Sequence, residues 1–250
     1  MGISGSQRDG NTNILVKECL KGAEEVKDVE TEFIHLADYE IKGGCAACYA
    51  CFKKPSLERL CYYYDDELND VLRRMLEVDG YIFGSPVYWG SLTPLFRMFS
   101  DRTHPLYTNN RAIRNRPAGS VTCALGRVAG QEHVIAALNR FIMFHDMIPI
   151  GNAVIWPAEG MSSIWGVAGR QGWPKAVGST AEGNRMAVKQ DKAAMACARI
   201  LGVRVAEMSK VIKAGFEMVN PENGETVFPR GAVTAEQLKE AGDIHFAYKE

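Results

Sequence analysis

Short apolar segments alternate along the chain with longer stretches in which apolar residues recur at helical spacing. The short segments 29–36, 81–83, 120–125 and 148–156 have the pattern of buried strands. The longer stretches 65–78, 92–99, 131–144 and 184–214 have the pattern of helices. Strands that alternate with helices predict an α/β protein with a parallel sheet and helices on both faces.

Glycine and proline positions refine these elements. Thr93-Pro94 predicts the start of the helix 92–99, and Gly202 predicts a break in the long stretch 184–214. Residues 157–180 are rich in glycine and form a predicted loop of unusual length, which indicates a functional or mobile insert. The tail 215–250 contains turn residues and the capping box Thr234-x-x-Gln237, so we expect a short helix there.

Composition narrows the class of protein. The 250 residues suffice for one large domain, and the formal net charge of −1 gives no reason to expect nucleic acid or an acidic membrane as a partner. The sequence has no apolar run near the roughly 20 residues that cross a bilayer. Its seven cysteines are unevenly spaced, which does not suggest a secreted disulfide framework and fits a reducing cytoplasm.

Four of the cysteines follow a pattern that packing does not require. Cys45, Cys48 and Cys51 are three residues apart, and Cys61 follows. Three thiolates on one short turn, with a fourth farther along, suit an iron–sulfur cluster and favour a [4Fe–4S] centre. Zinc and a thiol–disulfide pair remain alternatives. Cys19, Cys123 and Cys197 lie in apolar patterns and are expected to fill the core.

Three loops follow predicted strands, where doubly wound sheets bind ligands. Residues 3–13 combine hydroxyls, glycine and one arginine before a helix, the chemistry of a phosphate site. Residues 84–91 place two aromatic side chains beside small ones, which can line a flat ring. Residues 125–132 carry Arg127 and two glycines and can approach the edge of such a ring.

In order and spacing, these motifs resemble the flavodoxin-like NAD(P)H-dependent FMN reductases, specifically their iron–sulfur flavoprotein branch. The resemblance covers residues 2–214. It rests on the loop Gly5-Ser6-x-Arg8, the cysteine pattern, Asp65-Asp66, Gly84-Ser85-Pro86-Val87-Tyr88, Asp101-Arg102, Gly126-Arg127…Gly130-Gln131-Glu132, and Ala198-Arg199-x-Leu201-Gly202.

The resemblance implies a flavodoxin-like, doubly wound, parallel five-stranded sheet and assigns residues to two cofactors. The FMN phosphate would be held by Ser4, Ser6, Arg8, Asn11, Thr12 and Asn13. The isoalloxazine ring would be lined by Pro86, Val87, Tyr88, Trp89, Gly90 and Ser91, with Gly126, Arg127 and Gly130 at its pyrimidine end. Cys45, Cys48, Cys51 and Cys61 would ligate the [4Fe–4S] cluster.

Domains and departures from the family follow from the same comparison. Residues 1–214 would form the FMN-binding domain, with the iron–sulfur loop at 43–64, and residues 215–250 an extension that packs on the domain or on a neighbouring subunit. The gap between Cys51 and Cys61 is longer than the family's compact spacing, so the fourth ligand is the one that departs from the family pattern. The chain starts at Met1-Gly2-Ile3, which truncates the first strand, so we expect the native start to lie upstream.

Three functions are compatible with these residues. The leading one is an oxidoreductase that moves electrons between NAD(P)H or ferredoxin, FMN and the cluster, as a homodimer or homotetramer, with a small-molecule acceptor possible. The second is a flavin dehydrogenase or reductase specific for a small aromatic or chorismate-like compound, with 157–180 as a lid. The third is an electron carrier without a substrate of its own. If a side chain acts as acid or base, the candidates are Tyr88, His104 and Arg127.

Overall fold

The computed structural model describes residues 1–126, 129–151, 165–170 and 185–219. Its centre is a parallel sheet in the order β2-β1-β3-β4-β5, and β6 also pairs with β4. The strands are β1 (Gly2–Ser4), β2 (Phe33–His35), β3 (Tyr81–Pro86), β4 (Pro117–Ala124), β5 (Ile148–Pro149) and β6 (Val167–Arg170). This order confirms the predicted flavodoxin-like, doubly wound sheet.

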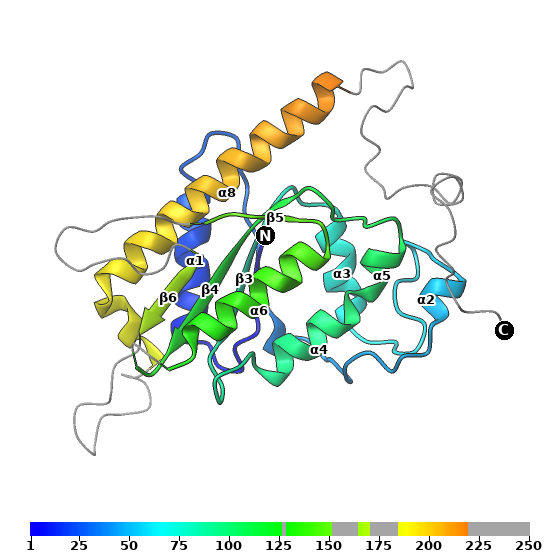
Figure 1. The fold of residues 1–250 in the computed structure, drawn as a ribbon, viewed down its shortest axis with the longest axis horizontal. Coiled ribbons are helices and arrows are strands. Elements are labelled where there is room, and N and C mark those ends of the chain that lie inside the picture. The colour runs from blue at the N-terminus through cyan, green and yellow to red at the C-terminus, as the bar shows by residue number, and fades with distance from the viewer. Residues whose placement is uncertain (127–128, 152–164, 171–184, 220–250) are drawn as a thin grey trace.

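Helices cover both faces of the sheet (Figure 1). On one face, α1 (Asn11–Ala23) and α8 (Lys192–Val219) pack around a core that includes Leu15 and Leu201. On the other, α3 (Leu68–Leu76), α4 (Pro94–Arg102) and α6 (Gln131–Phe144) enclose a core with Phe83 and Phe96. The short elements are α2 (Ala50–Lys53), α5 (His104–Thr108) and the 3₁₀ turns η1 (Leu36–Asp38) and η2 (Ala187–Gln190).

Predictions that depend on neighbouring residues are confirmed for two helices. The helix predicted at 131–144 has the bounds of α6, and Thr93 caps α4 by accepting a hydrogen bond from the Phe96 amide at 3.2 Å. Only Phe33–His35 of the predicted strand 29–36 joins the sheet. The upstream start stays a prediction. Structurally, the short β1 is buried and pairs on both sides, with Ile3 opposite Ile34 and Phe83.

The structure corrects two predictions, the loop at 157–180 and the helix break at Gly202. Two short strands, and not one, lie beside β4 at the edge of the sheet: β5 pairs with the start of β4 and β6 with its end. The second strand comes from the predicted loop 157–180, whose remaining residues, Trp173 among them, lie outside the described ranges apart from 165–166. Helix α8 also continues through Gly202 without a break, because this glycine is where α8 approaches α1.

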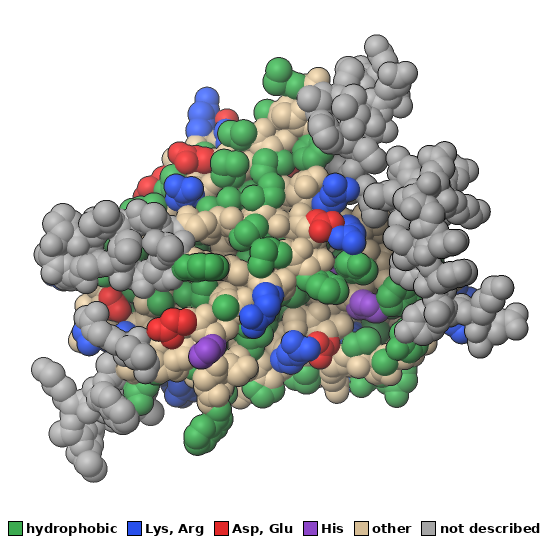
Figure 2. All heavy atoms as spheres, viewed as in Figure 1, with side chains coloured by type: hydrophobic (Ala, Val, Ile, Leu, Met, Phe, Trp, Pro, Cys, Tyr) green, Lys and Arg blue, Asp and Glu red, His purple; other side chains and the backbone are tan. Residues whose placement is uncertain are grey.

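The described surface carries a mixture of charged and apolar side chains (Figure 2). None of the described helices is long and apolar enough to cross a bilayer. On the described part of the face shown in Figure 2, basic, acidic and apolar side chains alternate rather than form a continuous basic field. The tail beyond residue 219, with the predicted cap at Thr234, lies outside the described residues.

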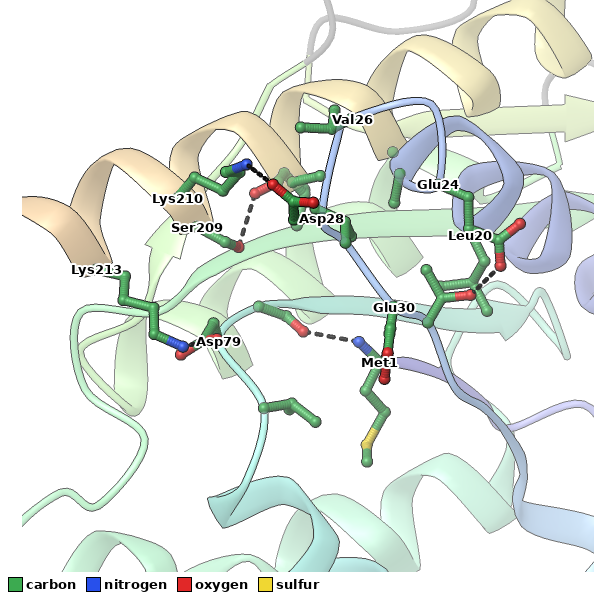
Figure 3. Close-up of a pocket in the computed structure, with 18 of the residues that line it drawn as sticks. Met1, Leu20, Glu24, Val26, Asp28, Glu30, Asp79, Ser209, Lys210 and Lys213 are labelled. Carbon is green, nitrogen blue, oxygen red and sulfur yellow. Dashed lines mark hydrogen bonds and ion pairs between the residues drawn. The ribbon is translucent and has the colours of Figure 1, made fainter.

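A hollow of about 1020 Å³ lies at the amino end of the strands. Figure 3 shows that Met1 reaches into it and that ion pairs between Lys213 and Asp79 (3.0 Å) and between Lys210 and Asp28 (3.9 Å) lie at its margin. The Met1 amine donates to the Gly80 carbonyl at 2.9 Å, and burial lowers its pKa to about 6. Among its described lining residues there is no predicted site residue, so the candidate site lies at the other end of the sheet.

Candidate functional site

The loop between β1 and α1 is held by its own side chains. The Ser4 hydroxyl donates to Asn13 Oδ1 at 2.6 Å, and the Ser6 amide donates back to the Ser4 oxygen at 3.3 Å. The Asn13 amide nitrogen donates to Asp9 at 2.9 Å, a bond that lowers the pKa of that carboxyl. Ser4 and Asn13 are buried, so these two predicted phosphate ligands act here as supports for the loop.

The remaining predicted residues of this loop line a small hollow of about 30 Å³. It is bordered by Ser6, Arg8, Gly10, Asn11, Thr12, Pro86, Tyr88, Cys123 and Arg185. The hollow lies at the start of α1, a 13-residue helix without a described side-chain cap or an acidic residue in its first turn. Backbone amides at such a helix start attract anions, which fits the predicted phosphate position.

The second predicted loop is a tight turn that projects an aromatic ring into solvent. Tyr88 and Ser91 exchange two backbone hydrogen bonds of 3.0 Å, and Trp89 and Gly90 between them have φ values of 50° and 72°. Positive φ at both central residues is typical of a type I′ turn, in which a bulky residue is strained. The Trp89 side chain is fully exposed, whereas Pro86 and Tyr88 line the hollow.

The third loop packs against this turn. Gly130 has a φ of 93°, and a Cβ atom there would lie 2.8 Å from Gly90 Cα. Gln131 fixes the loop: its side-chain oxygen accepts from the Ala129 amide at 2.9 Å, and its amide nitrogen donates to the Gly126 carbonyl at 2.5 Å. Arg127 lies outside the described residues.

Several residues that support these loops were missed by the sequence reasoning. Arg185 joins the hollow from a segment far along the chain, and Cys123, expected in the core, borders it as well. Burial raises the pKa of Cys123 to about 12, which keeps it a neutral thiol. The His35 ring contacts the Ser6 carbonyl at 2.8 Å, and Thr93 donates to the Gly5 carbonyl at 2.6 Å. Only Thr93 carried a local signal, as a helix cap.

The cysteine loop is exposed and irregular. Cys45 and Cys48 are exposed, while Cys51 and Cys61 are partly buried. Ala47 and Tyr49, between the first three cysteines, have φ values of 51° and 55°. Such left-handed residues are strained unless their surroundings require the conformation, and they cluster at ligand sites.

One side chain at the α4–α5 junction, His104, contacts the cysteine loop. His104 Nδ1 lies 3.5 Å from Cys51 Sγ, and burial lowers the pKa of this histidine. Burial, followed by the charge of Cys45 and more weakly that of Cys48, raises the pKa of the Cys51 thiol. Within the described ranges, no three Cys, His, Asp or Glu side chains are arranged so that they could already hold a metal ion.

The two predicted sites lie apart in a single chain. In Figure 1, α2, which carries Cys51, lies at the opposite end of the molecule from the carboxyl ends of β4 and β6. Gly44 lies against Asp101 and Met98 of α4, so the segment that leads into the cysteines runs along this helix. The chain therefore brings the flavin-type loops together with one another but not with the thiols.

Comparisons with known proteins agree with this architecture. Residues 1–160 match the family model of the NADPH-dependent FMN reductases. An iron–sulfur flavoprotein of Methanocaldococcus jannaschii is 36% identical over 214 residues, which cover 85% of this chain and 98% of the relative. One from Archaeoglobus fulgidus is 29% identical, with 85% and 96% covered.

Solved structures share the fold. RosB, in a crystal structure with a bound 8-demethyl-8-formylriboflavin-5'-phosphate intermediate, superposes with a TM-score of 0.61 at 16% identity, covering 100% of this chain and 89% of that one. A WrbA-like flavodoxin from Agrobacterium tumefaciens gives 0.50 at 16% identity, with 84% and 96% covered. The chain is thus an FMN-binding oxidoreductase that belongs to the NADPH-dependent FMN reductase family, in its iron–sulfur flavoprotein branch.

Proposed function

We propose that this oxidoreductase transfers electrons between FMN and a [4Fe–4S] cluster held by Cys45, Cys48, Cys51 and Cys61, with NAD(P)H or ferredoxin as donor. The observation that carries the proposal is a set of four free thiols on one surface loop in a chain of the FMN reductase family. When bound, the flavin supplies two-electron chemistry and the cluster one-electron chemistry.

The residues fit a flavin at the three loops. Arg8 and Thr12, with the backbone amides at the start of α1, would hold the phosphate, because they border the hollow there. Pro86 and Tyr88 would contact the ring from the second loop. A Cβ atom at Gly90 would have no described atom within 4 Å, so the turn leaves open space beside it. Arg127 remains a proposed contact at the pyrimidine end.

The thiols fit a cluster by their chemistry. Four cysteines are the usual ligand set of a [4Fe–4S] centre. The first three lie within a span of seven residues, and two of them are open to solvent. The left-handed backbone at Ala47 and Tyr49 has a reason if the loop folds around a ligand. None of the seven cysteines, all of which lie in the described residues, forms a disulfide, which supports a reducing compartment such as the cytoplasm.

The separation of the two sites supports a homo-oligomer. Because α2 lies at the opposite end of the subunit from the carboxyl ends of β4 and β6 in Figure 1, electrons would reach the flavin of a second copy more directly. We therefore propose a homodimer or homotetramer in which the cysteine loop of one subunit faces the flavin of another.

Anaerobic purification with quantitation of iron, sulfide, zinc and FMN tests the cofactors. We expect about four iron and four sulfide per chain with one FMN. Cys45→Ser and Cys61→Ser should lose iron, while Cys197→Ala, which changes a buried core cysteine, should keep it. Stoichiometric zinc, or FMN without metal, would refute the cluster and leave a zinc or thiol-reactive loop.

Anoxic reduction identifies the donor. Bleaching of the flavin by NADH or NADPH, or by reduced ferredoxin, would support the electron-transfer function. Bleaching only by a chorismate-like or aromatic compound would instead favour the substrate-specific enzyme, and rapid exchange with ferredoxin alone would favour an electron carrier.

A further inference from the structure

A buried arginine joins the two ends of the cysteine loop. Arg102, the last residue of α4, has a side chain that is 1% exposed. Its Nη1 donates to the Gly43 carbonyl at 3.3 Å, just before the first cysteine. Its two terminal nitrogens donate to both oxygens of Asp66, at 2.8 and 3.0 Å, just after the last cysteine. The guanidinium also lies over the Tyr64 ring, 4.7 Å from its centre.

The last cysteine is fixed by the same segment. The Cys61 amide donates to Asn69 Oδ1 at 3.2 Å, and Asn69 donates in turn to the Tyr64 carbonyl at 3.0 Å. Leu60, the neighbour of Cys61, is buried in the core. Cys61 therefore lies where the exposed loop returns to the folded body, three residues before Tyr64, whose ring covers Arg102.

One nitrogen of the guanidinium has no acceptor. Among the described residues, Arg102 Nε is buried without a hydrogen-bond partner. Leaving a buried N–H of a charged group unpaired is costly, so the site calls for an acceptor. Cys61 belongs to the same short segment as Tyr64 and Asp66, which both contact this guanidinium.

We propose that Arg102 is a positioning residue for the metal centre: it joins the two ends of the cysteine loop and offers its free Nε–H to sulfur at the Cys61 corner. This inference rests on the cluster proposed above. Hydrogen bonds to sulfur and nearby positive charge favour the reduced form of a cluster and so raise its reduction potential. It also gives Cys61, whose spacing departs from the family pattern, a structural reason to be the fourth ligand.

The test uses two variants and a matched control. Arg102→Lys keeps the charge but loses the two-pronged contact and Nε, because lysine has a single ammonium group. The pair Arg102→Gln/Asp66→Asn removes both charges, so that no unpaired carboxylate stays buried. The control is Arg111→Lys, since Arg111 also pairs with an aspartate, Asp146 at 2.5 Å, and lies 4.7 Å over a tyrosine ring.

Two measurements are made on the anaerobically purified full chain. The first is the midpoint potential of the cluster by titration followed with electron paramagnetic resonance, together with iron per chain. We expect both Arg102 variants to shift the ratio of reduced to oxidised cluster at least tenfold toward oxidised at a fixed potential, about 59 mV for a one-electron couple. The control should match wild type.

The second measurement is hydrogen exchange of residues 43–66 in the metal-free protein, with circular dichroism to verify folding. Exchange should be faster in both Arg102 variants than in wild type and in Arg111→Lys, because the loop ends are no longer joined. Wild type without iron would refute the proposed function. A wild type that holds the cluster, with unchanged potential, iron content and exchange in both Arg102 variants, would overturn the role of Arg102.

Discussion

Replacing Gly202 by alanine tests the contact between the two helices on one face of the sheet. A Cβ atom at Gly202 of α8 would lie 1.7 Å from the Cys19 carbonyl oxygen of α1. The contact is reciprocal, since a Cβ at Gly22 of α1 would lie 2.0 Å from the Arg199 carbonyl oxygen. Both obstructing atoms belong to helix backbones, so no side chain can rotate away and the helices must separate.

The sign of the effect depends on which of two terms is larger. Ordinary contact begins at 3.4 Å, so α8 would have to move about 1.7 Å from α1. Overpacking of this kind costs about 3 kcal/mol, at the upper end of the usual range. Alanine in place of glycine in a helix returns about 1 kcal/mol. We expect a net loss of about 2 kcal/mol or more in the free energy of unfolding.

Urea unfolding of the FMN-bound protein, followed by circular dichroism at equal excess flavin, measures this loss as a lower midpoint at unchanged slope. Gly215→Ala is the matched control in the same helix, because no described atom lies within 4 Å of its Cβ position. It should stabilise the protein by up to about 1 kcal/mol. If Gly202→Ala is as stable as wild type, Gly202 marks a helix weakness, as the sequence had suggested, and not a close contact.

Three further predictions concern the flavin loops and pH. Gly130→Ala, which forces a φ of 93° on alanine and a 2.8 Å contact with Gly90, should weaken FMN binding about tenfold by fluorescence titration. Gly215→Ala, with no described atom within 4 Å of its Cβ position, should leave the affinity unchanged, and equal affinities of the two variants would contradict the packing of the two loops. Arg185→Gln should weaken the binding of FMN about threefold, as expected for the loss of an exposed charge. The binding of riboflavin should not change, because only FMN carries the phosphate. An equal loss of affinity for both ligands would exclude a contact between Arg185 and the phosphate. Burial lowers the pKa of His145 from 6.5 to about 4, so the unfolded chain takes up a proton at a higher pH than the folded protein does. The free energy of unfolding should therefore fall by up to about 3 kcal/mol as the pH drops from about 6.5 to 4. His145→Gln should reduce this pH dependence of the urea midpoint, and an unchanged dependence would assign the acid sensitivity to other groups.

The sequence by itself determined the features that neighbouring residues encode. The helix at 131–144 has its apolar residues at helical spacing, and Thr93-Pro94 contains both a cap and a residue suited to a first turn, so local patterns sufficed. The order of strands and helices likewise fixed the class of fold. The loop compositions predict a phosphate site and a metal site, because those chemistries need particular residue types close together in the chain, and both sites stay predictions.

Only the tertiary structure decided how distant segments meet. A glycine inside a helical pattern is compatible with a helix break and with a close contact between two helices. At Gly202 the backbone of α1 lies against α8, so the glycine marks a close contact. Arg185 borders the same hollow as Gly10, although the two residues are far apart in the chain. Strand β6 likewise pairs with the distant strand β4 at the edge of the sheet. Arg102 meets Gly43 and Asp66 for the same reason. Such contacts depend on how buried surfaces pack in three dimensions, which a periodic pattern of apolar residues does not specify.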